Sequence, residues 1–238
     1  MLKNIKWIFL GVLLLALYSQ ATILPQRVGP VSQYGKLITG EDLNGKGRIY
    51  GSIQGVKKDA EVQLMGLSLS WSLQWPSGGA FYGSSYLKSL VEKQNPELIR
   101  AAMGAVATWG RGNYLTRPEF YLAQMDTIVQ ASIQNDIYVL IDFHSEGGYW
   151  FTLHPGAEPK YEFNDSQMSF TKEQAAEFFS IMAARYGKYP HVIFEIYNEP
   201  VSETWSELKD YSETVITAIR KHSDNLIVVG TPMWSSMA

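Results

Sequence analysis

The sequence contains no cysteine and little charge of either sign. Without cysteine, the chain cannot form disulfides, thiolate metal sites or a cysteine nucleophile. Charged residues make up 18% of the chain, the formal net charge is -3, and no run of Lys or Arg occurs. We therefore expect no nucleic-acid partner, because such partners are bound by basic surfaces.

Motifs for nucleotide binding and for serine hydrolases are also missing. No G-x-G-x-x-G follows the first expected strand, and neither a P-loop nor a G-x-S-x-G motif occurs. The chain instead has 46% hydrophobic residues in 238 positions, which is enough to bury a large core. Its 7 Trp and 14 Tyr offer rigid apolar faces with polar edges, which suit ligand binding.

The first 21 residues have the pattern of a secretory signal peptide. Lys3 and Lys6 precede an apolar run over 7–18, and small residues follow at 19–21. The run is shorter than the 20 or so residues that span a bilayer. We expect cleavage, a secreted protein and no membrane partner afterwards; an uncleaved N-terminal anchor is the alternative.

Residues 22–61 and residues 62–238 differ in pattern. Seven glycines lie between positions 29 and 55, and short stretches between them, such as Arg48–Tyr50, predict a small hairpin or two. We expect this N-terminal hairpin region to pack on the larger domain formed by residues 62–238.

Strand and helix patterns alternate in the larger domain. Apolar stretches predict strands at 62–69, 97–103, 137–143, 192–197 and 226–229. Helices are expected at 85–94 and behind three capping boxes, at Thr116–Glu119, Thr171–Gln174 and Thr204–Glu207. The helix after Thr171 has the apolar stripe Ala175, Phe178, Phe179, Met182 and Tyr186 and should end at Gly187.

This alternation indicates an α/β fold with parallel strands covered by helices. An open doubly wound sheet and a (β/α)8 TIM barrel both fit. We favour the barrel because polar side chains gather where the strands end, as they do in barrel enzymes. Each strand–helix unit takes about 41 residues, so only five strands fit before the last residue. The expected fold is a (β/α)8 barrel truncated after its fifth strand.

The most informative stretch is His191–Pro200, an apolar strand that ends in Asn198-Glu199-Pro200. Proline stops the strand and places Glu199 at its tip. A carboxyl half-buried there among aromatic rings would have a raised pKa and could act as a general acid. The alternative is an ordinary turn with a solvated Glu199.

The sequence PHVIFEIYNEP resembles the fourth-strand signature of glycoside hydrolase family 5, the large cellulase family. Four further segments resemble that family in the same order: Val62–Ser68 with Leu73–Trp75, Glu97–Met103, Tyr138–His144, and Val228–Ser235. The resemblance extends from about Val28 to Ala238. It implies a (β/α)8 barrel that hydrolyses β-linked glycans with retention of configuration, without a cofactor or metal.

The resemblance also implies roles for single residues. Glu199 would be the general acid/base, and Asn198 would contact the sugar. Arg100 would orient the nucleophile, and His144 would line the subsite at the cleavage point. The family's nucleophile is a Glu at the end of strand seven, which is not in this chain. Trp71 departs from the pattern, because many members carry a His near that place.

Five tryptophans that follow strands are candidates for sugar stacking: Trp71, Trp75, Trp109, Trp150 and Trp234. For any one of them, core packing is an equal alternative. Trp205 follows a cap, and we expect it to pack on its helix. Glu195 is expected inside the barrel and needs a partner. His144, His154 and Glu146 fit no zinc spacing that would support a metal site.

The resulting hypothesis is an N-terminal part of a secreted endo-β-1,4-glucanase acting on cellulose or a related β-glucan. Mannanase or xyloglucanase activity of the same family remains open. The alternative from another class is a glycan-binding remnant without catalysis. A third expectation is poor solubility and no activity for the 238-residue chain alone, because an open barrel exposes strand edges and apolar surface.

Overall fold

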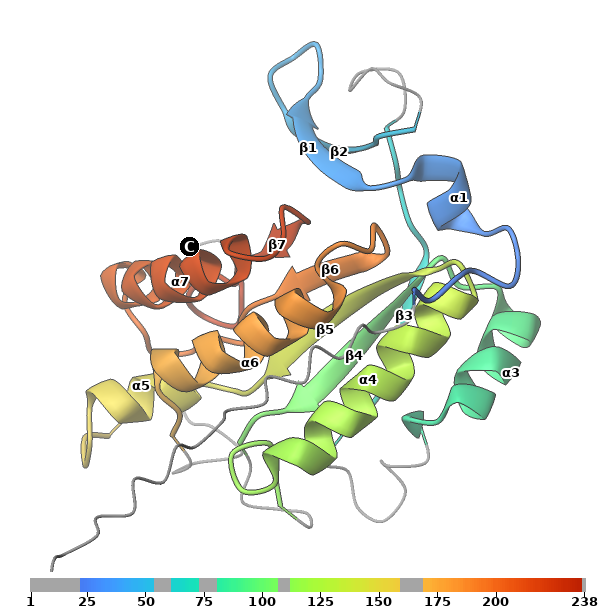
Figure 1. Ribbon diagram of the computed structural model, residues 1–238. Helices are drawn as coiled ribbons and strands as arrows, with labels where there is room; N and C mark the ends of the chain where they lie inside the picture. The colour runs from blue at the N-terminus through green and yellow to red at the C-terminus, as the bar shows by residue number, and fades with distance from the viewer. Residues whose placement is uncertain (1–21, 54–60, 73–80, 107–111, 159–168, 237–238) are drawn as a thin grey trace, which may run out of the picture.

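The computed structural model describes residues 22–53, 61–72, 81–106, 112–158 and 169–236 (Figure 1). The elements are α1 (Pro30–Tyr34), β1 (Leu37–Glu41), β2 (Gly47–Gly51), β3 (Gly66–Ser68), α3 (Ser84–Gln94), β4 (Leu98–Gly104), α4 (Pro118–Gln134), β5 (Tyr138–His144), α5 (Gly148–Leu153), α6 (Lys172–Tyr186), β6 (Val192–Glu195), α7 (Trp205–Arg220) and β7 (Ile227–Val228). The expected signal peptide, Trp75 and Trp109 lie outside the described residues.

Strands β3 to β7 form one parallel sheet, in which their order is their order in the sequence. β4 and β5 pair from Leu98 opposite Tyr138 to Gly104 opposite His144. A doubly wound sheet reverses its strand order at a switch point, and the five described strands show no reversal. The sheet is therefore an open wall of the (β/α)8 type, which confirms the predicted fold class.

Helices cover the sheet and bury their apolar stripes against it. In Figure 1, α4 and α6 lie in front of the sheet, with α3 beside α4 and α7 beside α6. The predicted stripe of α6, from Ala175 to Tyr186, is buried in one core with Phe143 of β5 and Phe194 of β6. Since most of these side chains are fully buried, the apolar core fixes which helix faces point inward.

Two of the three predicted capping boxes are present. Thr171 and Gln174 bond reciprocally at the start of α6, and Thr204 and Glu207 do so at the start of α7. The third prediction was wrong, because the N-cap of α4 is Arg117 and it makes no side-chain cap. Thr116 instead exchanges hydrogen bonds with Asn113 in the preceding turn.

The end of α6 is set by close packing. A Cβ at Gly187 would lie 2.4 Å from the Ala183 oxygen and 2.6 Å from the Ser223 Cβ. Gly187 has φ -62°, so its backbone is open to any residue. The glycine is needed there because only a hydrogen fits between α6 and the loop that follows α7.

The N-terminal region contains the predicted hairpin, in which β1 pairs with β2 in antiparallel register. It contacts the sheet domain through polar bonds near α1. Asp136 accepts hydrogen bonds from the backbone N–H groups of Gly29 (2.5 Å) and Ser32 (3.0 Å). The Tyr138 hydroxyl donates to the Gly35 oxygen at 2.6 Å. The boundary between the N-terminal region, residues 22–61, and the larger domain stays a prediction.

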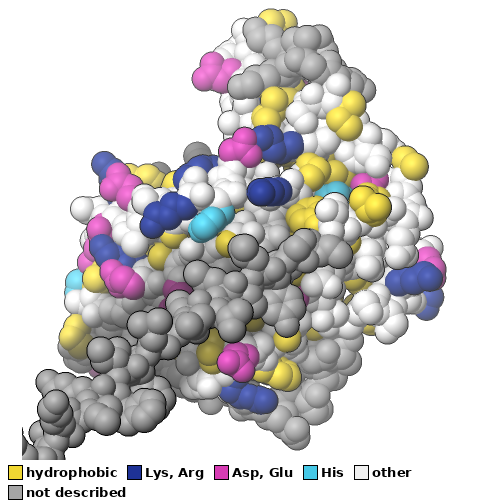
Figure 2. Space-filling model, in the orientation of Figure 1, with side chains coloured by type: hydrophobic (Ala, Val, Ile, Leu, Met, Phe, Trp, Pro, Cys, Tyr) yellow, Lys and Arg dark blue, Asp and Glu magenta, His cyan; other side chains and the backbone are white. Residues whose placement is uncertain are grey.

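The outer surface carries charges of both signs. Figure 2 shows Lys and Arg side chains interspersed with Asp and Glu on the face that includes α6 and α7. Lys172 pairs with Asp210, and Arg185 pairs with Asp126, both at 2.6 Å. Among the helices that the structure describes, none is long and apolar enough to cross a membrane.

Candidate active site

Polar side chains from three neighbouring strands meet at the carboxyl end of the sheet. The register pairs Ala102 with Asp142, Gly104 with His144, and Asp142 with Glu195. Residues two apart on a strand share a face, so Arg100, Asp142, His144 and Glu195 point to the same side. Ala102 and Gly104 are small, which leaves room for the charged side chains beside them.

Arg100 is the centre of this cluster. Its Nε and Nη2 donate to the two oxygens of Glu195 at 2.6 and 2.9 Å. Nη2 also donates to Asn198 Oδ1 at 2.7 Å and lies 2.8 Å from Asp142 Oδ2. The geometry brings together three residues that the sequence singled out, Arg100, Asn198 and Glu195, and gives Glu195 the partner it was expected to need.

Burial and charge set the protonation of the cluster. Burial raises the pKa of Glu195, and the negative charge of Asp142 adds to this, while the bond to Arg100 opposes it. Burial alone would lower the pKa of Arg100, but its bond to Glu195 and the charges of Asp142, Glu195 and Glu199 raise it. Arg100 is therefore a permanent cation beside these carboxylates.

His144 stands next to the cluster and is fixed from two sides. Its Nδ1 is in close hydrogen-bonding contact with Asp142 Oδ2. The Trp71 ring packs edge-on against it, with ring centroids 4.1 Å apart and an interplanar angle of 74°. The predicted His144 and Trp71 are thus in direct contact, and the imidazole has little freedom to rotate.

Glu199 is held by backbone bonds between two loops. Its N–H donates to the Ser145 oxygen at 3.2 Å, and its oxygen accepts from the Gly147 N–H at 3.0 Å. The side chain is half-buried, and its charge acts on Arg100. The loops that follow β5 and β6 therefore set the position of Glu199 together.

Glu203 joins the same two loops and was not predicted. Glu203 is 3% exposed, and its carboxylate accepts hydrogen bonds from the Tyr197 hydroxyl (2.5 Å), the Val201 N–H (2.6 Å) and the Trp150 N–H (3.1 Å). Burial raises its pKa, although these donors oppose the shift. The sequence holds no motif for this role, because two of the donors are backbone groups and the third is the hydroxyl of Tyr197.

The described tryptophans differ in how much surface they offer. Trp71 is partly buried against His144. Trp234 is 41% exposed, and its backbone N–H donates to the Pro200 oxygen at 2.8 Å. Trp150 is only 7% exposed, which fits packing better than sugar stacking. Trp205 is 60% exposed, so the expectation that it packs on its helix was wrong. Their roles in binding stay predictions.

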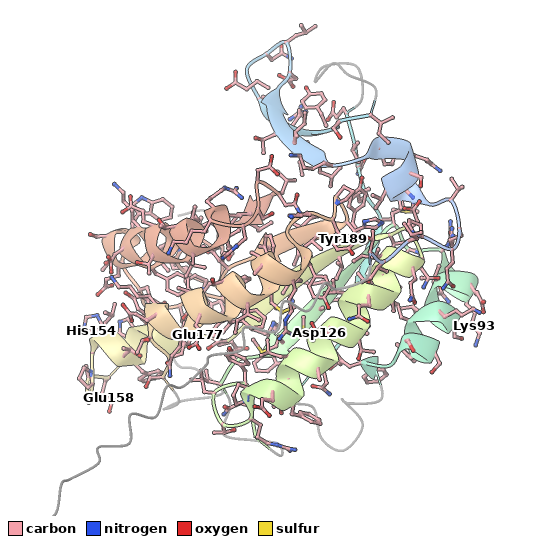
Figure 3. The ribbon with its side chains drawn as sticks, in the orientation of Figure 1. Lys93, Asp126, His154, Glu158, Glu177 and Tyr189 are labelled. Carbon is pink, nitrogen blue, oxygen red and sulfur yellow. The ribbon has the colours of Figure 1, made fainter. Side chains whose placement is uncertain are left out.

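His154 belongs to a separate pair at the edge of the site. Its Nε2 lies 2.7 Å from Glu207 Oε1, and its ring packs on Trp150 with centroids 4.8 Å apart. In Figure 3, His154 lies at the left edge of the molecule, at the side opposite Lys93. Among the described residues, no three His, Asp or Glu side chains form a group that could hold a metal.

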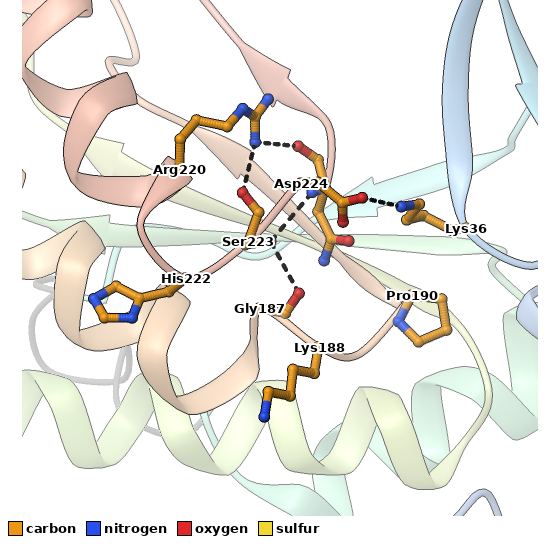
Figure 4. Close-up of a pocket in the computed structure, with 9 residues that line it drawn as sticks. Lys36, Gly187, Lys188, Pro190, Arg220, His222, Ser223 and Asp224 are labelled. Carbon is orange, nitrogen blue, oxygen red and sulfur yellow. Dashed lines mark hydrogen bonds and ion pairs between the residues drawn. The ribbon is translucent and has the colours of Figure 1, made fainter.

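A pocket of about 590 Å³ lies at the other end of the sheet (Figure 4). Its lining includes Lys188 and Pro190, which precede β6, and Ser223 and Asp224, which precede β7. It is therefore at the amino ends of β6 and β7, opposite the carboxyl end of β6, where Glu195 and Glu199 lie. Lys188 and Arg220 lie beside the last turns of α6 and α7, where positive charge is favourable.

Comparisons with known proteins point to one family. The model of the family "Cellulase (glycosyl hydrolase family 5)" matches residues 56–238. Endoglucanase Z of Dickeya dadantii (strain 3937) is 40% identical over 172 residues, 71% of this chain and 35% of that protein. An endoglucanase of Clostridium saccharobutylicum is 37% identical over 73% of this chain and 34% of its own length.

A solved structure from Cytophaga hutchinsonii superposes with a TM-score of 0.67 at 35% identity, covering 87% of this chain and 57% of that one. The chain spans about a third of the length of these curated relatives and just over half of the solved structure. The match covers the described site from β3 to β7. The chain therefore belongs to the cellulase family, glycosyl hydrolase family 5.

Proposed function

We propose that this chain forms part of a secreted glycoside hydrolase that cleaves internal β-1,4-glucosidic bonds of cellulose or a related β-glucan with retention of configuration. The observation that carries the proposal is the Arg100 cluster beside Glu199. One partly buried cation joins Asn198, Glu195 and Asp142 at the carboxyl end of the sheet. This is the end of a (β/α)8 fold where catalytic groups lie.

Glu199 acts as the general acid/base in this proposal. Its carboxylic acid donates a proton to the glycosidic oxygen as the bond to the leaving sugar breaks, and its carboxylate later takes a proton from the attacking water. Asn198 is fixed by its bond to Arg100 and presents its amide nitrogen to a sugar hydroxyl. Arg100 orients the second carboxylate, and His144 lines the subsite at the cleavage point.

Retention requires two carboxyl groups about 5 to 5.5 Å apart, one to donate the proton and one to attack the anomeric carbon. Asp142 and Glu195 are both bound by Arg100, but neither lies at the end of a seventh strand, where the resemblance places the nucleophile. We assign the nucleophile to a glutamate outside residues 1–238. The proposal requires no cofactor and no metal.

A β-glucan substrate is supported by the names of the relatives and by the aromatic side chains at the site. Trp71 and Trp234 carry partly exposed rings beside His144 and the Glu199 loop. Sugar rings stack on such surfaces, because their C–H faces are apolar. Mannan or xyloglucan would use the same acid/base and different contacts along the chain of sugars.

The first test is hydrolysis of carboxymethyl cellulose by the full-length protein and its Glu199→Gln variant. Glutamine keeps the shape of Glu199 and cannot donate the proton, so we expect kcat to fall by a factor of about 10² to 10⁴. The exposed Glu213→Gln variant is the control. Unchanged turnover in Glu199→Gln would remove Glu199 from the role of acid/base.

The competing function is glycan binding without turnover. It is favoured if the protein binds cellotetraose in isothermal titration calorimetry but releases no reducing sugar in hours of incubation. Secretion is tested separately, by determining the first residue of the protein recovered from the medium. A protein that begins near residue 22 supports the signal peptide, and retention in the membrane fraction supports the anchor.

A further inference from the structure

Asp142 is a buried carboxylate for which the proposed mechanism has no direct use. It is fully buried, and both of its contacts run through one oxygen. Oδ2 meets Arg100 Nη2 at 2.8 Å and also His144 Nδ1. Oδ1 is buried and has no hydrogen-bond partner among the described residues. The carboxylate is thus directed at two donors, one of which belongs to the substrate-facing histidine.

A carboxylate can only accept a hydrogen bond, so the nitrogen that faces it must carry the proton. In a neutral imidazole one nitrogen carries a proton and the other has a lone pair. The contact with Asp142 therefore fixes the proton of His144 on Nδ1. It leaves Nε2 as an acceptor, and Nε2 has no partner among the described residues.

We infer that Asp142 is a positioning residue that selects the Nδ1–H tautomer of His144, so that Nε2 accepts a hydrogen bond from a sugar hydroxyl. This deepens the proposed function and rests on it. Trp71 supports the arrangement, because its edge-on contact prevents the ring from turning its other nitrogen toward Asp142. Arg100 supports it too, because its Nη2 lies 2.8 Å from the same oxygen of Asp142 and holds the carboxylate in position.

The simpler reading is that Asp142 only balances the charge of Arg100. The two readings differ in one measurable property. If Asp142 serves Arg100 alone, the tautomer of His144 is independent of Asp142. If Asp142 selects the tautomer, its removal must release the proton of His144 to both nitrogens. In serine proteases, a histidine that loses its carboxylate partner adopts the wrong tautomer.

The experiment is 15N-histidine NMR of the chain without ligand at about pH 9, where a histidine of ordinary pKa near 6.5 is neutral. The chain has only 4 His, so the ring signals can be assigned by substitution. We expect the wild-type His144 to carry its proton on Nδ1. We expect Asp142→Ala to shift the proton population toward Nε2.

The control is Glu207→Gln, which changes the partner of His154 in a second acid–histidine pair outside the cluster. It should alter the His154 signals and leave His144 unchanged. A proton on Nε2 in the wild-type chain would overturn the inference even if Asp142→Ala fails to fold. An unchanged Nδ1–H tautomer in a folded Asp142→Ala chain would overturn it as well.

Addition of cellotetraose separates this inference from the proposed function. We expect binding to shift the Nε2 signal of His144, because the lone pair becomes a hydrogen-bond acceptor. Binding without any change at Nε2 contradicts the acceptor role alone. Absence of binding by the full-length protein contradicts the proposed function, whereas the tautomer measured without ligand still decides the part played by Asp142.

Discussion

At the scale of single residues, Arg100 is the side chain that connects the polar groups of the candidate site. It is one cation that holds two largely buried carboxylates and an amide in place. Removing one member of a buried ion pair leaves the other charge uncompensated, which costs more than the pair contributes. We expect Arg100→Ala to lower the free energy of unfolding by about 3 to 5 kcal/mol, measured by urea denaturation.

The control for Arg100→Ala is Lys209→Ala. Lys209 and Glu213 form a pair on α7 at 3.8 Å, and both side chains are 69% exposed. Solvent screens such pairs, so the loss should stay within about 1 kcal/mol. Equal losses for the two variants would show that the Arg100 cluster does not stabilise the fold.

At the scale of elements, the capping boxes give the clearest prediction. The Thr204 side chain caps α7 by accepting from the Glu207 N–H, and Glu207 bonds back to Thr204. Thr204→Ala should destabilise the chain by about 1 kcal/mol, because an N–H of the first turn loses its acceptor. The readout is the midpoint of urea unfolding.

Thr217→Ala on the same helix is a matched control. Its hydroxyl only bonds back to the Glu213 oxygen one turn earlier, and the residue is exposed. Alanine has the higher helix propensity, so this change should be neutral or slightly stabilising. A loss as large as that of Thr204→Ala would mean that threonine itself, and not the cap, matters in α7.

The sequence predicted elements well where the signal is local. The α6 stripe and the caps at Thr171 and Thr204 depend on neighbours in the chain, and both are present. Thr116 shows the limit of such a pattern, because Asn113 competes for its hydroxyl and N–H. The contact of Glu203 with the Trp150 N–H joins residues 53 positions apart, so no local pattern predicts it.

The sequence predicted which residues belong to the candidate site, but not how their side chains contact one another. Arg100, His144, Asn198 and Glu199 were recognised from motifs at strand ends. Asp142 lies in the same motif as His144, yet its contact with Arg100 depends on the register of β4 against β5. Register follows from packing of the whole sheet, which a single strand sequence does not determine.

At the scale of the whole molecule, His191 makes stability depend on pH. Burial lowers its pKa, and Asp136, the charged group that faces it at 3.2 Å, opposes the shift. The folded chain therefore binds fewer protons than the unfolded chain just below the ordinary pKa of about 6.5. Stability is fully present above that pH and falls as the pH drops, by at most about 1.4 kcal/mol per pH unit.

The measurement compares urea midpoints at about pH 8 and about pH 5.5, on either side of the ordinary histidine pKa. His191→Gln keeps a donor for Asp136 and does not titrate, so the loss on acidification should shrink. His222→Gln removes an exposed histidine and should retain the full loss. The same acid sensitivity in all three proteins would locate its origin outside His191.

The agreement between strand order and sequence order has a consequence for synthesis. Each described strand of the sheet pairs with the one made just before it, and the ribosome extends the chain from the N-terminus at about 5 to 20 residues per second. Each new strand thus has its pairing partner already synthesised when it leaves the ribosome. The sheet can therefore extend by one strand–helix unit at a time. Arg100 on β4 is synthesised before Asp142 of β5 and Glu195 of β6, the two carboxylates that it binds.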